Sequence, residues 1–487
     1  MITFTLSLIA LVLGFFFYGK IIERIVAPTD APTPAVTKAD GLDFIALPNW
    51  KVFMIQFLNI AGTGPIFGAI MGAKFGPVAY LWIVFGCIFA GAVHDYLIGI
   101  LSLRHGGAGL PELVGTYLGK TSKKIMLVFT VLLLIMVGTV FVYSPAEILH
   151  GISGSTTMWI ALIFSYYIIA TMLPIDKIIG RIYPLFAFSL LFMAAALMVV
   201  LFIKMPKLPE IWTHAYNMGM ATDAGWTDTI FPCLFITIAC GAVSGFHATQ
   251  SPLMSRCLKS ERMGRPVFYG AMITEGVVAL IWATVASWFF YGSPAPGYEL
   301  IADATKGFHT SAPAVVNLVC NDWLGVVGAV LAILGVVAAP ITSGDTAFRS
   351  SRLIVAEWLK LDQRPIKNRL YICIPLFACS IAILFWQIEN PDGFNVVWQY
   401  FGWSNQTLTV FTLWTCTVYL VSKKKPYVVT LIPALFMTSI CVTFLLLSKQ
   451  AFGMDETLSY YIGGACSVIA LTWFLIWKQQ QQNKQTI

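Results

Sequence analysis

The sequence predicts an all-α protein that crosses a membrane many times, and its composition and its periodicity carry that prediction. Of 487 residues, 58% are hydrophobic and 11% are charged, whereas soluble domains carry roughly a quarter charged residues. Apolar stretches of about 20 residues, the length that crosses roughly 30 Å of hydrocarbon, recur along the chain. Because lipid cannot satisfy free backbone groups, such stretches are expected to be helices.

About thirteen stretches are long enough to be transmembrane spans. The first lacks a basic leader and a small-residue cleavage site, so we expect a retained helix rather than a removed signal peptide. The expected spans lie near residues 2–19, 50–73, 76–102, 122–142, 155–173, 182–204, 229–255, 266–291, 323–342, 370–388, 396–421, 427–447 and 459–477.

The distribution of Lys and Arg predicts the orientation in the membrane. When successive loops are assigned to alternate sides, 25 of the 30 basic residues fall on one side. The other five are Lys74, Lys204, Lys207, Lys306 and Lys449. By the positive-inside rule, we expect the N-terminus to lie outside and the C-terminus in the cytoplasm, and we expect the membrane to be a bacterial inner (plasma) membrane. The basic loops 256–265 and 343–369 could contact regulators or anionic lipid, although topology signals explain them adequately, and no nucleic-acid partner is expected.

Two spans are interrupted by glycine and proline near their middle. Residues 60–65 read Ile-Ala-Gly-Thr-Gly-Pro, and residues 240–247 read Cys-Gly-Ala-Val-Ser-Gly-Phe-His. Each interruption could be only a kink or a packing contact, since glycine is common in membrane helices. However, each opens a run of five expected spans, and the loop charges start these runs on opposite faces.

This pattern predicts an inverted repeat of five plus five helices, with one helix before it and two after it. The corresponding segments of the chain are 1–49, 50–204, 205–421 and 422–487. Interrupted helices at matching positions of two inverted halves indicate a transport site near the bilayer midplane. The substrate-binding candidates there are Gly62, Thr63, Gly64, Gly241, Ser244, Gly245 and His247.

Ionisable residues inside spans are costly in hydrocarbon and are therefore functional candidates. Glu275 lies near mid-depth, and we expect it to carry a proton, although a neutral carboxyl that bonds a neighbouring helix is the alternative. Asp95 is a second candidate, but it could simply pair with Arg104. His94 is a third, and both it and His247 could instead be satisfied core histidines.

Two clusters of polar residues with oxygen-bearing side chains are further candidates. Residues 338–346 place hydroxyls and carbonyls near the end of the ninth span, where they could bind sodium or only satisfy the helix backbone. Ser404, Asn405 and Gln406 in the eleventh span could contact substrate or hold helices together.

No motif supports enzymatic activity. Residues 115–121 are the nearest approach to a phosphate-binding loop, but only three residues separate the glycines where four are required. The ten cysteines include no Cys-x-x-Cys pair and are expected to pack as small apolar residues. We therefore expect no cofactor, and the energy for transport should come from a proton or sodium gradient.

Several motifs, in order along most of the chain, resemble the carbon starvation protein A family. They are Asp40-Gly41-Leu42-Asp43, Ile60-Ala61-Gly62-Thr63-Gly64-Pro65, Ala90-Gly91-Ala92-Val93-His94-Asp95, Gly241-Ala242-Val243-Ser244-Gly245-Phe246-His247-Ala248 and Phe401-Gly402-Trp403-Ser404-Asn405-Gln406. The chain is similar to the shorter members. It departs from the family pattern at Gln56, where histidine is common, and at His94, where glutamine is common.

The resemblance implies a transporter related to the amino acid, polyamine and organocation superfamily, with a leucine-transporter-like core. It further implies a role in carbon starvation and uptake of peptides, or of pyruvate with protons. By the same resemblance, Ala339, Thr342 and Ser343 occupy the place of a sodium site.

The sequence thus predicts a secondary transporter that imports a small carboxylate or short peptides with protons or sodium. A gated channel for small polar solutes is the alternative, and it would require a continuous polar lining. The expected partners are the solute and the lipid bilayer, and no feature predicts an oligomeric state.

Overall fold

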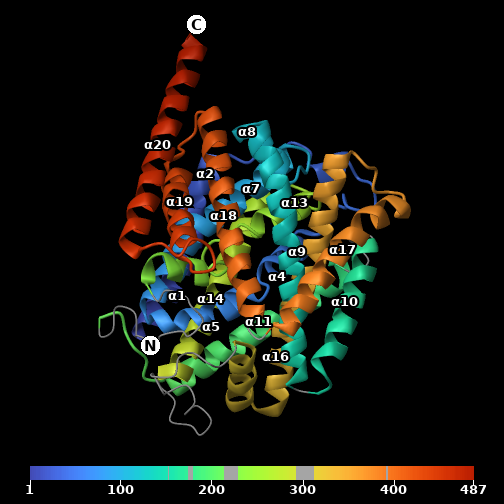
Figure 1. Ribbon diagram of the computed structural model, residues 1–487, viewed down its shortest axis with the longest axis vertical. Helices are drawn as coiled ribbons and strands as arrows, with labels where there is room; N and C mark the ends of the chain where they lie inside the picture. The colour runs from blue at the N-terminus through green and yellow to red at the C-terminus, as the bar shows by residue number, and fades with distance from the viewer. Residues whose placement is uncertain (152, 174–178, 213–228, 292–311, 391–392, 487) are drawn as a thin grey trace.

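The computed structural model describes residues 1–151, 153–173, 179–212, 229–291, 312–390 and 393–486, and every regular element in these ranges is a helix. The α-helices are α1 (Ile2–Leu13), α2 (Gly19–Val26), α3 (Pro34–Thr37), α4 (Asn49–Ile60), α5 (Ala69–Gly72), α6 (Val78–Leu81), α7 (Ala92–Arg104), α8 (Leu110–Leu118), α9 (Lys120–His150), α10 (Thr156–Met172), α11 (Ile179–Lys204), α12 (Phe235–Thr237), α13 (His247–Ser255), α14 (Gly270–Tyr291), α16 (Ala312–Leu359), α17 (Ile366–Glu389), α18 (Gly393–Ser422), α19 (Val428–Leu447) and α20 (Glu456–Thr486). The C-terminus lies at one end of the long axis of the bundle, and the N-terminus lies in the opposite half (Figure 1).

Eight helices of the described residues are long and apolar enough to cross a membrane. They are Ile2–Val26, Val78–Arg104, Lys120–His150, Tyr183–Lys204, Glu261–Phe290, Ile366–Glu389, Val428–Leu447 and Glu456–Asn483. The pair Asn49–Ile60 and Gly64–Phe75, bent by 52°, makes a ninth span if it is counted as one. The protein is therefore an all-α, multi-pass membrane protein.

The other four expected spans do not pass the same test of length and composition. Thr156–Met172 is apolar but shorter than the other membrane helices. The expected span 229–255 is divided into short helices, while α16 and α18 cover the expected spans 323–342 and 396–421. A total of about thirteen spans stays a prediction.

One expected loop is mostly helix. We interpreted residues 343–369 as a basic cytoplasmic loop, but α16 continues to Leu359. Arg349 and Arg352 on this extension are fully buried instead of facing solvent, because they form ion pairs with Asp43 inside the protein. The loop 256–265 is also partly folded, with a helical turn at Glu261–Met263.

The centre of the bundle is built around α16, which packs along α9 and along α11. Glycine permits one of these close approaches. A methyl group at Gly335 of α16 would lie 2.8 Å from the carbonyl oxygen of Ser189 in α11, closer than side-chain carbons come to such atoms. The site described below lies against this central helix.

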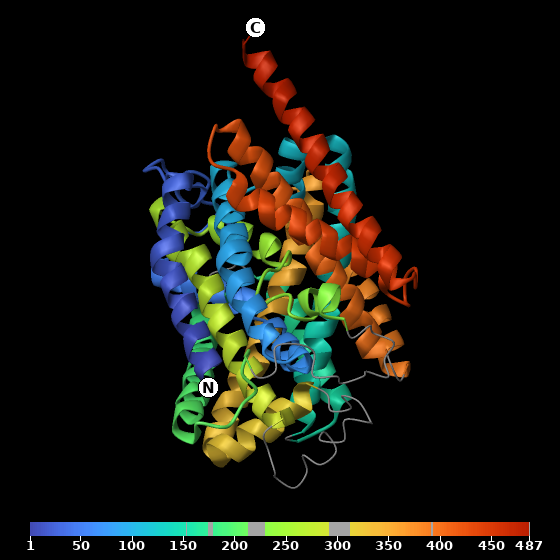
Figure 2. The ribbon, with the colours of Figure 1, turned by 90° about the vertical axis from the view of Figure 1, so that its left-hand side faces the viewer.

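The helices predicted outside the repeats are peripheral. The first, α1, packs against α14, while α19 packs against α18 and carries α20 on its other side. Figure 2 shows α20 slanting along one side of the bundle and α1 along another. The division of the chain at residues 49, 204 and 421 stays a prediction.

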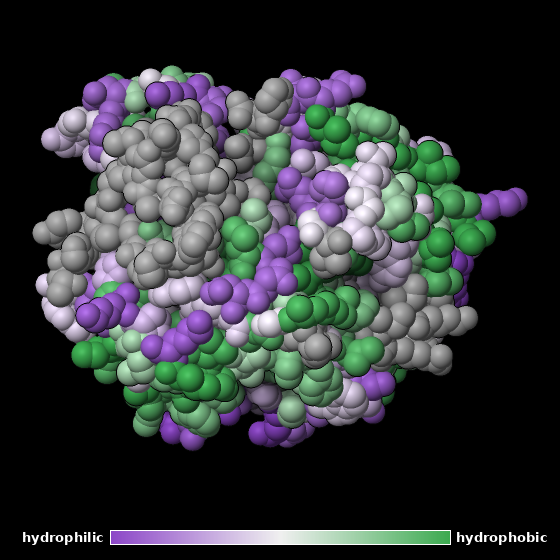
Figure 3. All heavy atoms as spheres, turned by 90° about the horizontal axis from the view of Figure 1, so that it is seen from below, coloured by the Kyte–Doolittle hydropathy of each residue, from purple (hydrophilic) through white to green (hydrophobic). Residues whose placement is uncertain are grey.

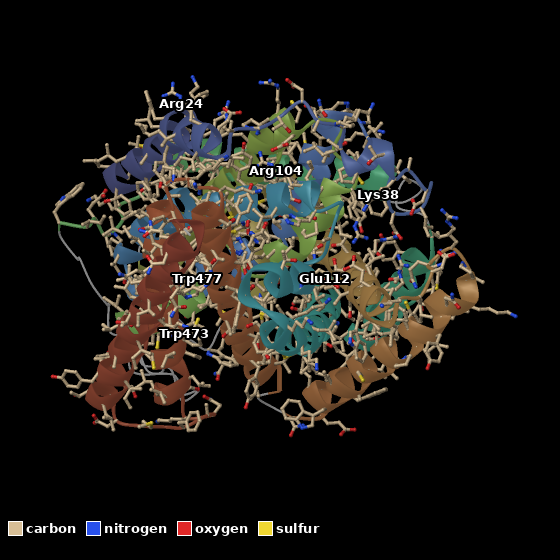
Figure 4. All side chains as sticks on the ribbon, turned by 90° about the horizontal axis from the view of Figure 1, so that it is seen from above. Arg24, Lys38, Arg104, Glu112, Trp473 and Trp477 are labelled. Atoms are coloured by element: carbon tan, nitrogen blue, oxygen red, sulfur yellow. The ribbon has the colours of Figure 1, made fainter. Side chains whose placement is uncertain are left out.

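Charged residues gather at the end of the bundle that holds the C-terminus. Figure 4 looks onto this end and labels Arg24, Lys38, Arg104 and Glu112. Ion pairs near it include Arg104 with Glu261, Lys123 with Glu112 and Arg256 with Glu357. At the opposite end, seen in Figure 3, hydrophilic side chains are interspersed with apolar ones. We refer to the end in Figure 4 as the basic end.

Candidate functional site

The first predicted break is present, slightly earlier than expected. Helix α4 ends at Ile60, residues Ala61 to Thr63 are not helical, and a π-helical turn begins at Gly64. Proline in the first turn of the new helix costs no hydrogen bond, because the first amides of a helix have no partner within it. The unwound part is therefore 61–63, and Gly64 and Pro65 already belong to the second half-helix.

The second predicted break is longer. Helix α12 ends at Thr237 and α13 begins at His247, with turns and irregular backbone between them. Gly241, Ser244 and Gly245 all lie in this unwound stretch, as the sequence predicts.

The two breaks lie side by side. A methyl group at Gly64 would collide with the side chain of Cys240, and one at Gly68 would lie 2.8 Å from the carbonyl oxygen of Thr237. Because residue 64 meets 240 and residue 68 meets 237, the two segments run in opposite directions. Glycine at positions 64 and 68 is what allows the two chains to approach so closely.

Asn405 and Gln406 hold the second break in shape. Asn405 Oδ1 accepts hydrogen bonds from the backbone N–H of Phe246, at 2.6 Å, and from the Ser244 hydroxyl, at 3.1 Å. Gln406 Nε2 donates to the carbonyl oxygen of Phe235 at 2.9 Å. These bonds connect α18 to the second break and to α12, Ser404 is buried beside them, and contact of this cluster with substrate stays a prediction.

The four ionisable candidates form one continuous chain of side chains. Asp95 Oδ1 lies 2.8 Å from His94 Nδ1, and Asp95 Oδ2 lies 2.9 Å from His247 Nδ1. On its other side, His247 Nε2 lies 3.4 Å from Glu275 Oε2. Helices α7, α13 and α14 contribute these residues, and all four side chains are fully buried. We call His94, Asp95, His247 and Glu275 the buried relay.

The hydrogen bonds of the relay restrict where its protons can lie. A carboxylate only accepts hydrogen bonds, so an ionised Asp95 fixes the protons of both imidazoles on Nδ1. His247 Nε2 and both oxygens of Glu275 have no hydrogen-bond partner in the described part of the chain. His94 Nε2 is unpaired in the described residues as well, so a further proton can be held there, by His247 Nε2 or by Glu275, and the last two face each other.

The expected alternative for Asp95 is wrong. Arg104 does not pair with it but bonds Glu261, with 2.7 Å between Arg104 Nε and Glu261 Oε1. It also donates to Tyr419 and to the carbonyl oxygens of Val26 and Ala27. The nine residue steps from position 95 to position 104 span about 13 Å along a helix, more than a side-chain contact bridges.

The ninth-span candidates face the first break. Ser343 Oγ donates towards the carbonyl oxygens of Leu58, at 3.2 Å, and Asn59, at 2.9 Å. These two carbonyls would bond residues 62 and 63 in an unbroken helix, so the break frees them. Thr342 Oγ1 instead bonds the carbonyls of its own helix, including that of Ala339 at 2.9 Å.

These oxygens suit a hard monovalent cation better than a transition metal. Neutral hydroxyl and carbonyl ligands are typical of alkali and alkaline-earth ions. Among the described residues, no group of His, Cys, Asp and Glu could hold a metal ion, and the ten cysteines are unpaired thiols. Ser343 with the Leu58 and Asn59 carbonyls would hold such an ion, with Thr342 and Ala339 adjacent.

Polar groups that the sequence did not single out also line the first break. The side-chain amide of Asn59 and the hydroxyl of Thr63 are fully buried and have no hydrogen-bond partner among the described residues. Gln56 Nε2 donates to Ser251 Oγ at 3.1 Å, but Gln56 Oε1 has no hydrogen-bond partner among the described residues. Unsatisfied buried polar groups are costly, so their presence beside a break favours a ligand site.

Buried ion pairs lie between the first break and the basic end. Asp43 Oδ1 lies 3.2 Å from Arg352 Nη2 and 3.6 Å from Arg349 Nη1, both on α16. Asp40 shapes the loop by accepting the backbone N–H groups of Leu42, Asp43 and Phe44 at 2.8–2.9 Å. Burial raises the pKa of Asp43, but Arg352, Arg349 and Arg256 outweigh this and lower it overall.

A large cavity opens on the far side of this ion-pair cluster. It encloses about 810 Å³ and is lined by charged residues of both signs, including Asp43, Arg256 and Glu357. The Asp43 cluster therefore separates a cavity at the basic end from the buried break, and we call it the Asp43 plug (Asp43, Arg349 and Arg352).

The fold is shared with solved transporters. The structure of an Eremococcus coleocola manganese transporter superposes with a TM-score of 0.57 over 92% of this chain and 99% of that one. Sequence identity is 12%, so the likeness concerns the fold alone.

Relatives of this chain are named as membrane proteins and transporters. A Haemophilus influenzae protein named as an uncharacterized membrane protein is 45% identical over 340 residues, 60% of this chain and 91% of its own length. Proteins named Peptide transporter CstA from Campylobacter jejuni and Escherichia coli are 26% and 25% identical. These two alignments cover 87% and 84% of this chain and 77% and 75% of the relatives.

The sequence profile described as Carbon starvation protein CstA matches residues 1–157, 140–308 and 297–444, which together cover most of the chain. The match includes both breaks and the whole buried relay. The protein therefore belongs to the carbon starvation protein CstA family of membrane transporters.

Proposed function

We propose that this protein is a secondary active transporter that imports a small carboxylate such as pyruvate, or short peptides, together with protons. The single observation that carries the proposal is the position of the relay. His247 is the first residue of α13, directly after the second break, and it faces Glu275 at 3.4 Å. A movement of the break on substrate binding would change that distance and with it the proton affinity of both groups.

Recognition of a carboxylate is supported by the first break. The half-helix Gly64–Phe75 begins there without a side-chain cap, and the hydroxyl of Thr63 is unpaired among described residues. The N-terminal end of a helix attracts anions because its first amides have no partner within the helix. A carboxylate at Thr63 would also satisfy the side-chain amide of Asn59.

The names of the relatives favour peptides, which also carry a terminal carboxylate. The site around the break is fully buried, so the bound solute would be enclosed by the protein. Such enclosure favours a carrier over a channel, because a channel requires a continuous polar lining.

The Asp43 plug would act as the gate towards the basic end. Opening of a path from the 810 Å³ cavity to Ser343 would require Asp43 to separate from Arg349 and Arg352. We place the basic end in the cytoplasm of a bacterial cell, with the N-terminus outside, by the positive-inside rule. Sodium at Ser343 is the second candidate for the coupling ion, favoured by the freed carbonyls of Leu58 and Asn59.

Uptake by the purified protein in liposomes tests the proposal. Labelled pyruvate and trialanine would be offered under an imposed proton gradient, an imposed sodium gradient, or neither. We expect accumulation above the external concentration with the proton gradient, and its loss when a protonophore is added. Equilibration without accumulation under every gradient would instead establish a channel or facilitator.

A further inference from the structure

A second cavity at the basic end is unlike the one beside the Asp43 plug. It encloses about 350 Å³ and is lined by Arg104, His105, Tyr117, Tyr419, Lys423 and Lys425. These residues come from the end of α7, from α8, and from the end of α18 with the loop that follows it. Arg104 lies in the central part of the basic end in Figure 4. We call this cavity the basic pocket.

The basic pocket has an excess of positive charge. Arg104, Lys423 and Lys425 line it, and none of its six lining residues is acidic. Glu261 neutralises Arg104, whereas the hydrogen bond of Lys425 among the described residues goes to the uncharged carbonyl oxygen of Val26, at 2.6 Å. Burial lowers the pKa of Lys425, and the nearby charges of Arg104 and Lys423 lower it further, although Glu261 opposes them. An anion in the pocket would relieve this repulsion.

The two tyrosines add hydroxyl groups to the cationic lining. Arg104 donates a hydrogen bond to the Tyr419 oxygen, so the hydroxyl proton of Tyr419 is free to be donated elsewhere. His105 Nδ1 lies 2.8 Å from the carbonyl oxygen of Leu101 and must donate to it. His105 Nε2 then accepts from the Tyr117 hydroxyl at 3.1 Å, which fixes that ring at the pocket wall.

Three consecutive lysines follow α18, and the backbone conformation there places two of them, but not the third, in the pocket lining. Lys424 adopts the left-handed conformation, with φ of 55°, although it is not a glycine. The backbone N–H of Lys425 donates to the carbonyl oxygen of Leu420 at 2.9 Å. The backbone N–H of Lys424 donates to the carbonyl oxygen of Val421, also at 2.9 Å, so the chain reverses direction there. Lys423 and Lys425 line the pocket, whereas Lys424 is exposed and does not.

We propose that the basic pocket is a binding site for a phosphate-type anion, separate from the transport site. Several cations and a free hydroxyl donor around one cavity match a tetrahedral oxyanion with several acceptor oxygens. Two sources share this chemistry: the headgroup of an anionic phospholipid and inorganic phosphate. Simple attraction of lysines to a helix C-terminus or to the membrane surface would involve Lys424 as much as its neighbours.

Thermal unfolding of the full-length protein in detergent tests this proposal. One arm adds phosphatidylglycerol, with phosphatidylcholine as its control, and the other adds inorganic phosphate, with chloride at equal ionic strength as its control. The double variant Lys423→Gln/Lys425→Gln removes pocket charges, and Lys424→Gln removes one charge from the same loop outside the pocket. Tyr419→Phe, which removes only the free hydroxyl donor of the pocket, provides a milder variant should the double variant fail to fold, and it should also weaken the response.

We expect the unfolding midpoint of the unmodified protein and of Lys424→Gln to rise in at least one arm. A rise with phosphatidylglycerol alone identifies a lipid headgroup, and a rise with phosphate identifies a free anion. In the double variant, the concentration of phosphatidylglycerol or phosphate that gives half of the rise should increase on the order of tenfold. This change corresponds to about 1.4 kcal/mol of binding free energy. No rise in either arm overturns the proposal, and so does an equal response of the double variant and Lys424→Gln.

Discussion

His247 Nε2 and Glu275 Oε2 face each other at 3.4 Å in the interior, and neither has a hydrogen-bond partner among the described residues. His247 also bonds Asp95 through its other nitrogen, at 2.9 Å. The imidazole therefore connects two carboxyl groups on two different helices, α7 and α14. Because the broken segment ends at this residue, the relay and the candidate substrate site share one hinge.

The two histidines of the relay should respond differently to substitution. His247→Gln interrupts the connection between Asp95 and Glu275, and we expect it to weaken the coupling of protons to substrate. Such coupling free energies are about 1–3 kcal/mol, or roughly 5- to 150-fold in substrate affinity between high and low pH. His94→Gln leaves the Asp95–His247–Glu275 connection in place and should retain most of this dependence. Substrate binding to the purified protein over a range of pH measures both variants.

The Asp43 plug should contribute stability that depends on pH. The pKa of Asp43 is lower in the folded protein than its usual value near 4, so the ionised carboxylate stabilises the fold above that value. This contribution is lost as the pH falls through the folded pKa. Asp43→Asn should therefore destabilise the protein at pH 7 by on the order of 3 kcal/mol, because it leaves two buried arginines unpaired.

Unfolding midpoints of both forms, measured from neutral to acidic pH, test this prediction. The difference between the unmodified protein and Asp43→Asn should shrink as the pH decreases below about 4. A constant difference at every pH would mean that the carboxylate charge of Asp43 does not stabilise the folded state.

The candidate cation site can be tested with Ser343→Ala. The change removes the hydroxyl that faces the Leu58 and Asn59 carbonyls but leaves the backbone intact. If sodium binds there, the half-saturating sodium concentration for transport should rise roughly tenfold, and Thr342→Ala should add to the effect. Thr412→Ala is the matched control, since it deletes a buried hydroxyl whose bond, among the bonds described, is to the carbonyl of Leu408 in its own helix. Unaltered sodium dependence in the Ser343→Ala/Thr342→Ala double variant would show that sodium does not bind at this site.

The contact between the two breaks predicts a specific rescue. Gly64→Ala places a methyl group against Cys240, so we expect transport to fall steeply. Cys240→Gly removes both atoms with which that methyl group collides, and the double variant should regain much of the lost activity. Failure of Cys240→Gly to improve Gly64→Ala at all would indicate that the breaks are not in contact in the membrane.

The sequence was sufficient to predict the eight long apolar helices of the described residues and the two breaks. Long apolar stretches and the Gly-Thr-Gly-Pro and Gly-Ala-Val-Ser-Gly interruptions are local features, and each determines local backbone geometry. The same reasoning identified His94, Asp95, His247 and Glu275 separately, because a buried ionisable residue is costly wherever it lies.

The sequence was not sufficient to show which of these residues meet. Asp95 and Glu275 are joined through His247 only when α7, α13 and α14 pack together. Arg349 and Arg352 were interpreted as topology signals, because nothing local to them shows that Asp43 lies opposite. The hydrogen bond that Asn405 accepts likewise could not be predicted, because its donor, the backbone N–H of Phe246, lies 159 residues away in the sequence.

Proton movement driven by substrate most directly tests whether the buried relay carries the coupled proton. Liposomes that contain the protein and a trapped pH indicator would receive pyruvate or trialanine without any imposed gradient. We expect a transported solute to acidify the lumen. Glu275→Gln should abolish this acidification, whereas Glu389→Gln, which alters an exposed carboxyl, should preserve it. Equal acidification per transported solute molecule in Glu275→Gln would contradict the proposal that the relay carries the coupled proton.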